Sequence, residues 1–497
     1  MESNSTNFKT ASRMYKKFSL LSLAISIVVS GFCFYLSEGL SGNFWYLLWI
    51  APIPILIISY YSSWKTTALV AFLAYLIGRL SWLPYLLTVV PGMLAILFTL
   101  LLPLIFAVIV LLNRFVIRAR INLVSIFAYP VFFCLFEWIG FLVSRDGTIA
   151  SLAYSQANFL PLIQIASIAG ILAISFWVCL FASTISMLWI FKKENKSITI
   201  PTIIGCSLIL LPLLFGIVRI SKSVEGKRIK VGLAVVPARS YKSFLDPNMD
   251  FEKKITQMHI KEIDSLAKSG VEIVVLAEKV IPVTDSSEPV IMEMLKDAAR
   301  RNGVTIVVGI TRIKTGYNRN IALVIDKNGR ILEDYEKVNL FPGEMYEGFR
   351  KGKDPGLFDW NSNPAGVAIC KDLDFDRYIA RYNEKSPQIL FVPAWDFDRD
   401  GWLHSRMAIL RSVENGYPMV RVAQQGRLTL NDNRGRVYAE ATTNGNQSTT
   451  LSGNIVLKNE NTLYRSLGYY FGELIAVCAI LFLFSGIVTK PTKNNPA

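Results

Sequence analysis

The sequence predicts a polytopic α-helical membrane bundle, of about eight spans, that carries an extramembrane α/β domain. Two observations predict this fold class. Hydrophobic residues make up 52% of the 497 residues and aromatic residues 12%, a composition typical of membrane proteins. Between positions 226 and 465, however, short apolar runs alternate with amphipathic segments. We therefore divide the chain into residues 1–225, 226–465 and 466–497.

A helix that crosses the bilayer needs roughly 20 mostly apolar residues. The stretches that meet this need are 18–35, 44–61, 68–87, 93–112, 123–143, 160–190, 199–218 and 467–488. The first part of the chain is thus predicted to form seven spans, and the last part an eighth span with a short tail.

Basic residues are unevenly distributed among the connections between these stretches. They precede the first stretch, follow the last, and recur in the second, fourth and sixth connections, for example at Lys9, Lys65, Arg114, Lys192 and Lys490. Because basic loops remain in the cytoplasm, both termini are predicted there, and residues 226–465 on the outer side of the membrane. The net charge of +15 then reflects this topology and contact with anionic lipid, and no nucleic-acid partner is expected.

Two charged residues lie inside predicted spans, where an ionisable group is costly and usually functional. Arg79 is in the third span and Glu137 in the fifth. Either these two side chains pair across the bundle, or Arg79 reaches the outer interface near Trp82 and Tyr85.

The extramembrane part is predicted to be an α/β domain with a core of its own. Continuous apolar runs predict buried strands at 229–236, 271–277, 304–310, 321–325, 366–369, 389–392 and 419–422. Helical spacing of apolar residues predicts helices at 251–268 and 290–301, and a further helix ending near Glu414.

Cys370 is the only cysteine in this extramembrane part, and the other five cysteines lie in the apolar stretches. It follows the predicted strand at 366–369 and precedes a charged cluster, so the strand delivers its side chain to a polar edge. An unpaired thiol is unusual in a compartment that favours disulfides, which points to chemistry. The alternative is a core cysteine.

Histidine and metal chemistry have little support. The whole chain contains two histidines, His259 and His404, so no zinc-type cluster is expected, and no Walker-type phosphate loop is present. No metal or cofactor is therefore predicted. A dyad between Cys370 and His404 is one alternative, and the other is that His404 only marks the start of a helix.

A thiol nucleophile without a histidine needs another proton acceptor and a cation that supports the developing oxyanion. Glu278 ends a predicted buried strand, where a partly desolvated carboxylate suits a general base. Lys337 lies where a charged stretch enters an apolar turn. Taken singly, these residues are also compatible with a solvated loop glutamate and a surface lysine.

In their order and spacing, Glu278, Lys337 and Cys370 resemble the Glu-Lys-Cys triad of the nitrilase (carbon–nitrogen hydrolase) superfamily. The turn at 342–344 is similar to the segment that places a second glutamate, here Glu344, near the site. The later segments 393–396, 404–411 and 414–418 resemble the loop, helix and strand that close the nitrilase core. The resemblance implies an α-β-β-α sandwich.

The arrangement of seven spans, external domain and eighth span resembles apolipoprotein N-acyltransferases over essentially the whole chain, as does the segment 80–83. The resemblance implies an enzyme of the bacterial inner membrane with its catalytic domain on the periplasmic side. It implies transfer of a phospholipid acyl chain, through a thioester on Cys370, to the α-amine of a diacylglyceryl-cysteine lipoprotein. Glu278 would act as the base, Lys337 would stabilise the oxyanion, and Glu344 would orient Lys337 or the amine. The partners are then the bilayer and two lipid substrates, and the chain is expected to be a monomer.

The residues after the cysteine depart from that family, which usually has an aromatic residue and then Glu. Here they are Lys371 and Asp372. Both are expected to line or brace the mouth of the site. Asp372 is expected to attract a cationic amine, and Lys371 to favour a phosphate head group and repel an amine unless a neighbour such as Asp374 neutralises it. The loop 340–349 is either a mobile lid at the lipid interface or a rigid surface loop.

Three alternatives remain at this point. A membrane-bound nitrilase-type amidase would use water in place of the amine, and an acyltransferase with another acceptor would use the same triad. A transporter or receptor would only bind a ligand. The eight-span body argues against a merely anchored amidase, because an anchor needs one helix, and the triad spacing argues against a binding protein.

Overall fold

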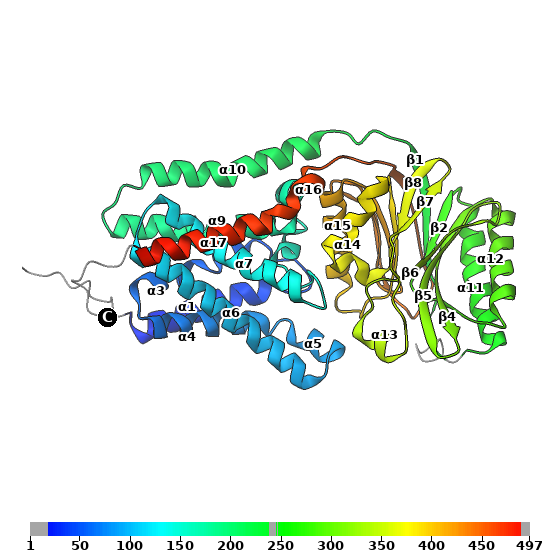
Figure 1. Ribbon diagram of the computed structural model, residues 1–497, viewed down its shortest axis with the longest axis horizontal. Coiled ribbons are helices and arrows are strands. Elements are labelled where there is room, and N and C mark those ends of the chain that lie inside the picture. The colour runs from blue at the N-terminus through cyan, green and yellow to red at the C-terminus, as the bar shows by residue number, and fades with distance from the viewer. Residues whose placement is uncertain (1–17, 238–244, 246, 489–497) are drawn as a thin grey trace, which may run out of the picture.

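The computed structural model describes residues 18–237, 245 and 247–488. A helical bundle and a two-sheet α/β domain lie end to end (Figure 1). The basic residues predicted before the first span and after the last one, at 9–17 and 490–493, lie outside the described residues.

The bundle is formed by α1 (Leu20–Ser37), α2 (Leu47–Ile50), α3 (Ile53–Tyr61), α4 (Trp64–Arg79), α5 (Leu83–Val89), α6 (Gly92–Ala119), α7 (Ala128–Val143), α8 (Leu160–Ile163), α9 (Ala166–Lys193), α10 (Thr199–Ser221) and α17 (Phe471–Val488). Among the described residues, 6 helices are long and apolar enough to cross a membrane, or 7 if the pair α4 and α5, bent by 62°, is one span. The polytopic bundle is thus confirmed, with a count close to the predicted one.

The second predicted span, 44–61, is shorter in the structure than expected, because its helical part is Leu47–Tyr61. It consists of the two short helices α2 and α3, which separate at Ala51 and Pro52. Pro52 and Pro54 both lack the N–H that would continue the helical hydrogen bonds, which explains the break.

Of the two alternatives for Arg79, the structure contradicts pairing with Glu137 and supports a position near Trp82. Arg79 Nη1 lies 3.6 Å from Glu38 Oε2, and its guanidinium lies over the ring of Trp82, 4.6 Å from the centroid. Glu137 Oε1 instead accepts a hydrogen bond from the backbone N–H of Leu152. Arg79, the last residue of α4, is thus paired with the residue that follows α1, and Glu137 of α7 is bonded to the backbone of a later turn.

The α/β domain contains two sheets. The first has the order β13-β1-β2-β4-β5-β6, with β3 paired to β4, and the second has the order β12-β11-β10-β9-β8-β7. The strands are β1 (Arg228–Val235), β2 (Ile273–Leu276), β3 (Ile281–Thr284), β4 (Thr305–Lys314), β5 (Tyr317–Ile325), β6 (Ile331–Glu336), β7 (Gly356–Trp360), β8 (Asn363–Val367), β9 (Leu390–Ala394), β10 (Met419–Ala423), β11 (Gln425–Asn431), β12 (Val437–Asn444) and β13 (Thr449–Val456).

Helices cover the outer face of each sheet (Figure 1). The helices α11 (Met249–Ala267) and α12 (Glu288–Asn302) lie on the first sheet, and α14 (Asp376–Ala380) and α15 (Gly401–Asn415) lie on the second. Between the sheets, one core joins buried residues of both, including Val275, Val307, Phe391 and Val420. The predicted α-β-β-α sandwich is confirmed.

Helix α15 joins the domain to the bundle. Its residues Leu403, Met407 and Leu410 belong to the same buried cluster as Phe132 and Ile174 of the bundle. Because α15 is covered by the sheet on one side and by the bundle on the other, burial of its apolar side chains holds the two parts together.

Candidate active site

The three residues of the predicted triad each follow a strand and converge on one place. Glu278 comes just after β2, Lys337 directly after β6 and Cys370 shortly after β8. Lys337 Nζ lies 2.8 Å from Glu278 Oε1, and both side chains are 2% exposed. Such a pair is desolvated, so its charges act strongly on neighbouring groups.

The chain at Glu278 passes unusually close to β4. Gly309 donates its N–H to Ala277 O, and Val280 donates to Gly309 O. A Cβ at position 309 would lie 2.2 Å from Ala277 O and 2.6 Å from the Cα of Glu278. Glycine at this position lets Glu278 turn out of the sheet toward Lys337.

Glu344 completes the ionic centre, and two further residues that the sequence did not indicate join it. Lys337 Nζ lies 2.9 Å from Glu344 Oε2, and Lys279 Nζ lies 2.9 Å from Glu344 Oε1. Asn320 Nδ2 donates to Glu278 Oε1 and to Glu344 Oε1, each at 2.6 Å. Its place just before the apolar run of β5 was the one available signal for Asn320.

The charged groups in this centre strongly shift one another's pKa values. Burial lowers the pKa of Lys337, but Glu278 and Glu344 raise it, and the net pKa lies well above its ordinary value. Burial raises the pKa of Glu344, yet Lys279 and Lys337 hold it well below its ordinary range. Burial and then Glu278 raise the pKa of the Cys370 thiol, against the effect of Lys337. The thiol is therefore protonated at neutral pH and needs a base to become a nucleophile.

Residues 369–374 form a tight turn, which we call the Cys370 turn because it carries the side chain of Cys370. The φ of Cys370 is 42°, in the left-handed region. This conformation costs a non-glycine residue about 1–3 kcal/mol and persists only when the surrounding structure holds it. The Sγ of Cys370 lies 3.8 Å from Trp395 O. The turn thus presents the thiol at the edge of the second sheet.

Asp372 is part of this turn, and its side chain is buried and not at the mouth of the site. It is fully buried, and its carboxylate accepts hydrogen bonds from Tyr335 Oη, from the N–H of Ile369 and from the N–H of Asn339. Burial raises its pKa to about 6. The side chain therefore braces the Cys370 turn, one of the two roles expected of it, and its buried carboxylate is not presented to an incoming amine.

Lys371 is also buried, and two carboxylates neutralise it. Its Nζ lies 2.6 Å from Asp146 Oδ1 in the bundle and 3.6 Å from Asp374 Oδ2. We expected Lys371 to repel a cationic amine unless a neighbour neutralised its charge. Asp374 and Asp146 together provide that neutralisation.

His404 has partners other than Cys370. Its Nε2 lies 3.1 Å from Asp400 Oδ2, and its Nδ1 lies 3.8 Å from Asp374 Oδ1. Burial lowers its pKa, but these carboxylates raise it to a net value of about 9. A protonated imidazole held by two aspartates is no base, so the alternative of a Cys370–His404 dyad is not supported.

The loop 340–349 has one buried and one exposed side. It forms the short helix α13 (Pro342–Tyr346), in which Glu344 is buried and Tyr346 is 92% exposed. The ring of Phe341 lies 5.2 Å from that of Phe397, measured between centroids. The loop is thus anchored at Glu344 and Phe341 while an aromatic side chain projects from its tip.

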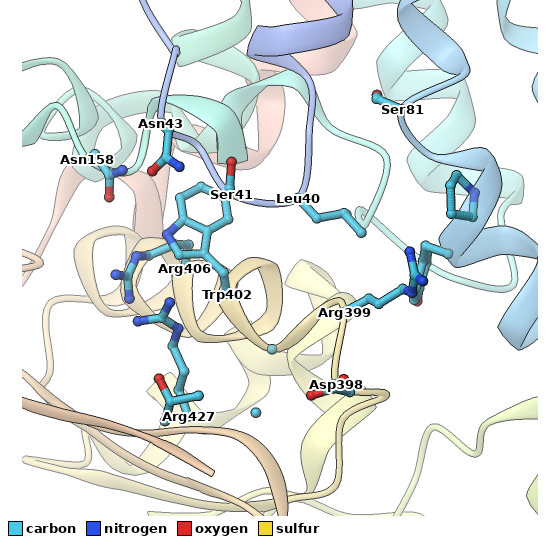
Figure 2. A pocket seen from close by; sticks show the side chains of 15 residues that line it. Leu40, Ser41, Asn43, Ser81, Asn158, Asp398, Arg399, Trp402, Arg406 and Arg427 are labelled. Carbon is cyan, nitrogen blue, oxygen red and sulfur yellow. The ribbon is translucent and has the colours of Figure 1, made fainter. Parts of the chain in front are cut away.

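A cavity of about 660 Å³ lies between the bundle and the second sheet. It is bounded by the loop after α1, by the bend between α4 and α5, and by the segment that leads into α15. In Figure 2, Arg406 and Arg427 lie at one end, Arg399 at the other, and Trp402 between them. Arg406 and Arg427 share the carboxylate of Glu440, so one of these two positive charges is left uncompensated.

The sequence matches two protein families along its length. Residues 26–184 match the apolipoprotein N-acyltransferase N-terminal domain, and residues 233–462 match the carbon-nitrogen hydrolase family. The apolipoprotein N-acyltransferase of Rickettsia prowazekii is 25% identical over 387 residues, which cover 71% of this chain and 76% of the relative. That of Aquifex aeolicus is 23% identical over 345 residues, covering 64% and 74%. The 2-oxoglutaramate amidase of Bacillus subtilis is 30% identical over 127 residues, covering 24% and 48%.

The fold and these similarities define a membrane-embedded acyltransferase of the nitrilase superfamily. It is a multi-pass inner-membrane protein that acts in lipoprotein N-acylation. The chain belongs to the apolipoprotein N-acyltransferase family.

Proposed function

We propose that this protein moves an acyl chain from a phospholipid, through a thioester on Cys370, to the α-amine of a diacylglyceryl-cysteine lipoprotein. The observation that carries the proposal is the buried Glu278–Lys337 pair, which acts electrostatically on the only cysteine of the α/β domain. An acid–base group, a cation and a thiol in one desolvated centre suit acyl transfer.

In the first half-reaction, Glu278 takes the proton of the Cys370 thiol, and the thiolate attacks an ester carbonyl of the phospholipid. The hydrogen bonds from Asn320 and Lys337 both reach Glu278 Oε1, so we assign the proton to Oε2. Lys337 and the N–H of Lys371 stabilise the oxyanion. The carbonyl–oxygen bond then breaks, Glu278 returns the proton to the leaving alkoxide, and a lysophospholipid departs.

In the second half-reaction, the lipoprotein amine attacks the thioester carbonyl and passes a proton to Glu278. The carbon–sulfur bond breaks, an amide forms, and the thiolate regains the proton from Glu278. Glu344 forms a second ion pair with Lys337, beside that of Glu278, which supports a role in orienting the cation. Because the domain is docked on the bundle through α15, the lipid substrates keep their acyl chains in the bilayer throughout.

We also propose that both termini are cytoplasmic, that the catalytic domain is periplasmic, and that residues 1–225, 226–465 and 466–497 are the functional units of a monomer. The orientation is supported by basic side chains that tie the even-numbered connections together: Lys196 Nζ donates to Ile121 O and Arg114 to Ser62 O. The turn between α9 and α10 lies at the end of the bundle away from the α/β domain (Figure 1).

The cavity with Arg399, Arg406 and Arg427 suits the phosphate of the donor head group, because guanidinium groups bind phosphate in a bidentate manner. We expect Arg406→Gln to raise the KM for phospholipid about tenfold, the loss of about 1.4 kcal/mol of binding. The rate of transfer from a preformed thioester should be unchanged. Steady-state kinetics in mixed micelles measure both, with Arg330→Gln, an exposed arginine on the far sheet, as the control. An unchanged KM would place the phosphate elsewhere.

The test of the proposed function is to trap the intermediate. The purified enzyme is incubated with acyl-labelled phospholipid and examined by mass spectrometry for an acyl adduct on the Cys370 peptide. A diacylglyceryl-cysteine peptide is then added, and the N-acylated product is measured. A thioester that releases only fatty acid would favour the amidase-like alternative. A stable thioester that never reaches the peptide would retain the first half-reaction and reject the lipoprotein acceptor.

A further inference from the structure

The Cys370 turn is held from two sides, and one of them is the membrane bundle. On the domain side, Asp372 accepts hydrogen bonds from Tyr335 Oη and from the N–H of Asn339, and Arg411 Nε donates to Leu373 O at 2.9 Å. On the bundle side lies the connection between α7 and Leu152, residues 144–151, which we call the bundle loop. This loop contacts the Cys370 turn although the two segments are more than 200 positions apart in the sequence.

Thr148 is the centre of this contact. Its backbone N–H and its hydroxyl both donate to Asp374 O, each at 2.9 Å. Its Oγ1 accepts from Arg411 Nη2 at 2.7 Å and from the hydroxyl of Tyr154 at 2.6 Å. The hydroxyl is therefore saturated and fully buried, and its geometry is fixed by three partners at once.

Gly147 and Asp146 make the contact tight and charge-balanced. Gly147 has a φ of 55°, and a Cβ there would lie 2.3 Å from Asp374 O. Asp146 binds the ammonium of Lys371, the residue that directly follows Cys370. An aromatic residue at position 371 could not form an ion pair with Asp146. The lysine at 371 and the aspartate in the bundle loop are therefore coupled in this protein.

We infer that the bundle loop is a positioning element of the active site, with Thr148 and Asp146 as positioning residues. The inference rests on the proposed thioester chemistry at Cys370. Cys370 is in a left-handed conformation that relaxes unless both ends of its turn are fixed. Thr148 fixes the C-terminal end at Asp374, and Asp146 fixes the residue whose N–H follows the thiol. The bundle therefore helps to aim the sulfur and this N–H at the substrate carbonyl, in addition to anchoring the enzyme.

The test compares Thr148→Val, which is isosteric but has no hydroxyl, with Thr148→Ser, which keeps it. A misplacement of about 1 Å costs about 100-fold in rate, so we expect Thr148→Val to slow acylation of Cys370 by 10- to 100-fold, with the phospholipid KM within about twofold. Thr148→Ser should recover to within about threefold of wild type. Asp146→Asn, at a half-exposed side chain, should slow acylation about three- to tenfold.

Two controls separate positioning from a general loss of structure. Thr99→Val removes a buried hydroxyl that bonds only to its own helix, and Glu473→Gln breaks another ion pair between bundle and domain, to Arg377. Both should retain wild-type acylation rates. The thermal unfolding midpoint is measured for every variant.

Alkylation of Cys370 by iodoacetamide, followed by mass spectrometry across pH 6–10, gives a readout independent of lipid chemistry. We expect slower alkylation near pH 7 in Thr148→Val, because the thiol is no longer held beside Glu278. If the wild-type enzyme formed no thioester, the proposed function would be wrong. The alkylation rates would still show whether the bundle loop positions the Cys370 thiol. The inference would be overturned if Thr148→Val and Asp146→Asn were acylated and alkylated at wild-type rates. It would also be overturned if Thr148→Val and Thr148→Ser lost equal fractions of the acylation rate.

Discussion

Replacement of Cys370 by alanine is expected to abolish acyl transfer while leaving the protein folded in the membrane. Loss of a covalent nucleophile lowers kcat by about 10⁵-fold or more, to the level of background chemistry. The side chain is small and partly exposed, so alanine leaves little void and the φ of the turn is unaffected by the change of side chain. Mass spectrometry after incubation with acyl-labelled phospholipid should find no adduct on the catalytic domain, and circular dichroism should match wild type.

The matched control for this experiment is Cys206→Ala. Cys206 lies exposed on α10, in a membrane-spanning segment, so its loss should leave both half-reactions intact. Appreciable product formation by Cys370→Ala would remove the thioester mechanism altogether. It would leave direct attack of the amine on the phospholipid ester as the remaining route.

Central strands and covering helices of the α/β domain were predictable because they are buried on both faces. The runs at 229–236, 304–310 and 389–392 are almost continuous in apolar residues, with Lys230 and Thr305 as the polar interruptions. Such runs are typical of covered strands, and they became β1, β4 and β9. The edge strands β12 and β13 were not found. Their side chains are mostly exposed or intermediate, so polar residues interrupt the pattern and no hydrophobic period remains.

The bundle was predictable in kind and less so in detail. Hydropathy detects a stretch of suitable length, but it does not register whether the backbone hydrogen bonds continue through it. The stretch 44–61 therefore appeared as one span, although Pro52 and Pro54 divide it into α2 and α3. Hydropathy likewise did not register the 62° bend between α4 and α5 in the stretch 68–87, where Pro84 lies in the first turn of α5.

The spacing of Glu278, Lys337 and Cys370 indicated which side chains to bring together. In the structure Glu278 and Lys337 form an ion pair, and both affect the pKa of the Cys370 thiol. The contacts that hold them were inaccessible from spacing, because they join residues far apart in the chain. Asn320 bonds to Glu278 and Glu344 from the middle of a hairpin. Asp146 reaches Lys371 from the bundle. Asp372, expected at the mouth, is turned inward by Tyr335 and Asn339.

Replacement of Glu278 by glutamine is expected to lower the rate of thioester formation by about 10³-fold, the contribution of a general base. Glutamine has the same shape, and Lys337 keeps Glu344 as its counter-ion, so the fold should be retained. Lys337→Ala is a harsher change, because it leaves Glu278 and Glu344 buried without that cation. We expect it to slow acylation and also to destabilise the protein by about 3–5 kcal/mol.

The pH dependence of acylation distinguishes loss of a base from mere disturbance of the site. Without Glu278, attack requires the small fraction of Cys370 that ionises unaided. The pKa of this thiol is raised by burial, so the fraction grows tenfold with each pH unit below that pKa. Acylation by Glu278→Gln should therefore rise steeply from pH 7 to pH 9, while the wild-type rate changes little. Glu293→Gln, at an exposed position on α12, should follow the wild-type profile. A Glu278→Gln variant that acylates at the wild-type rate, or whose residual rate is flat with pH, would show that Glu278 is not the base.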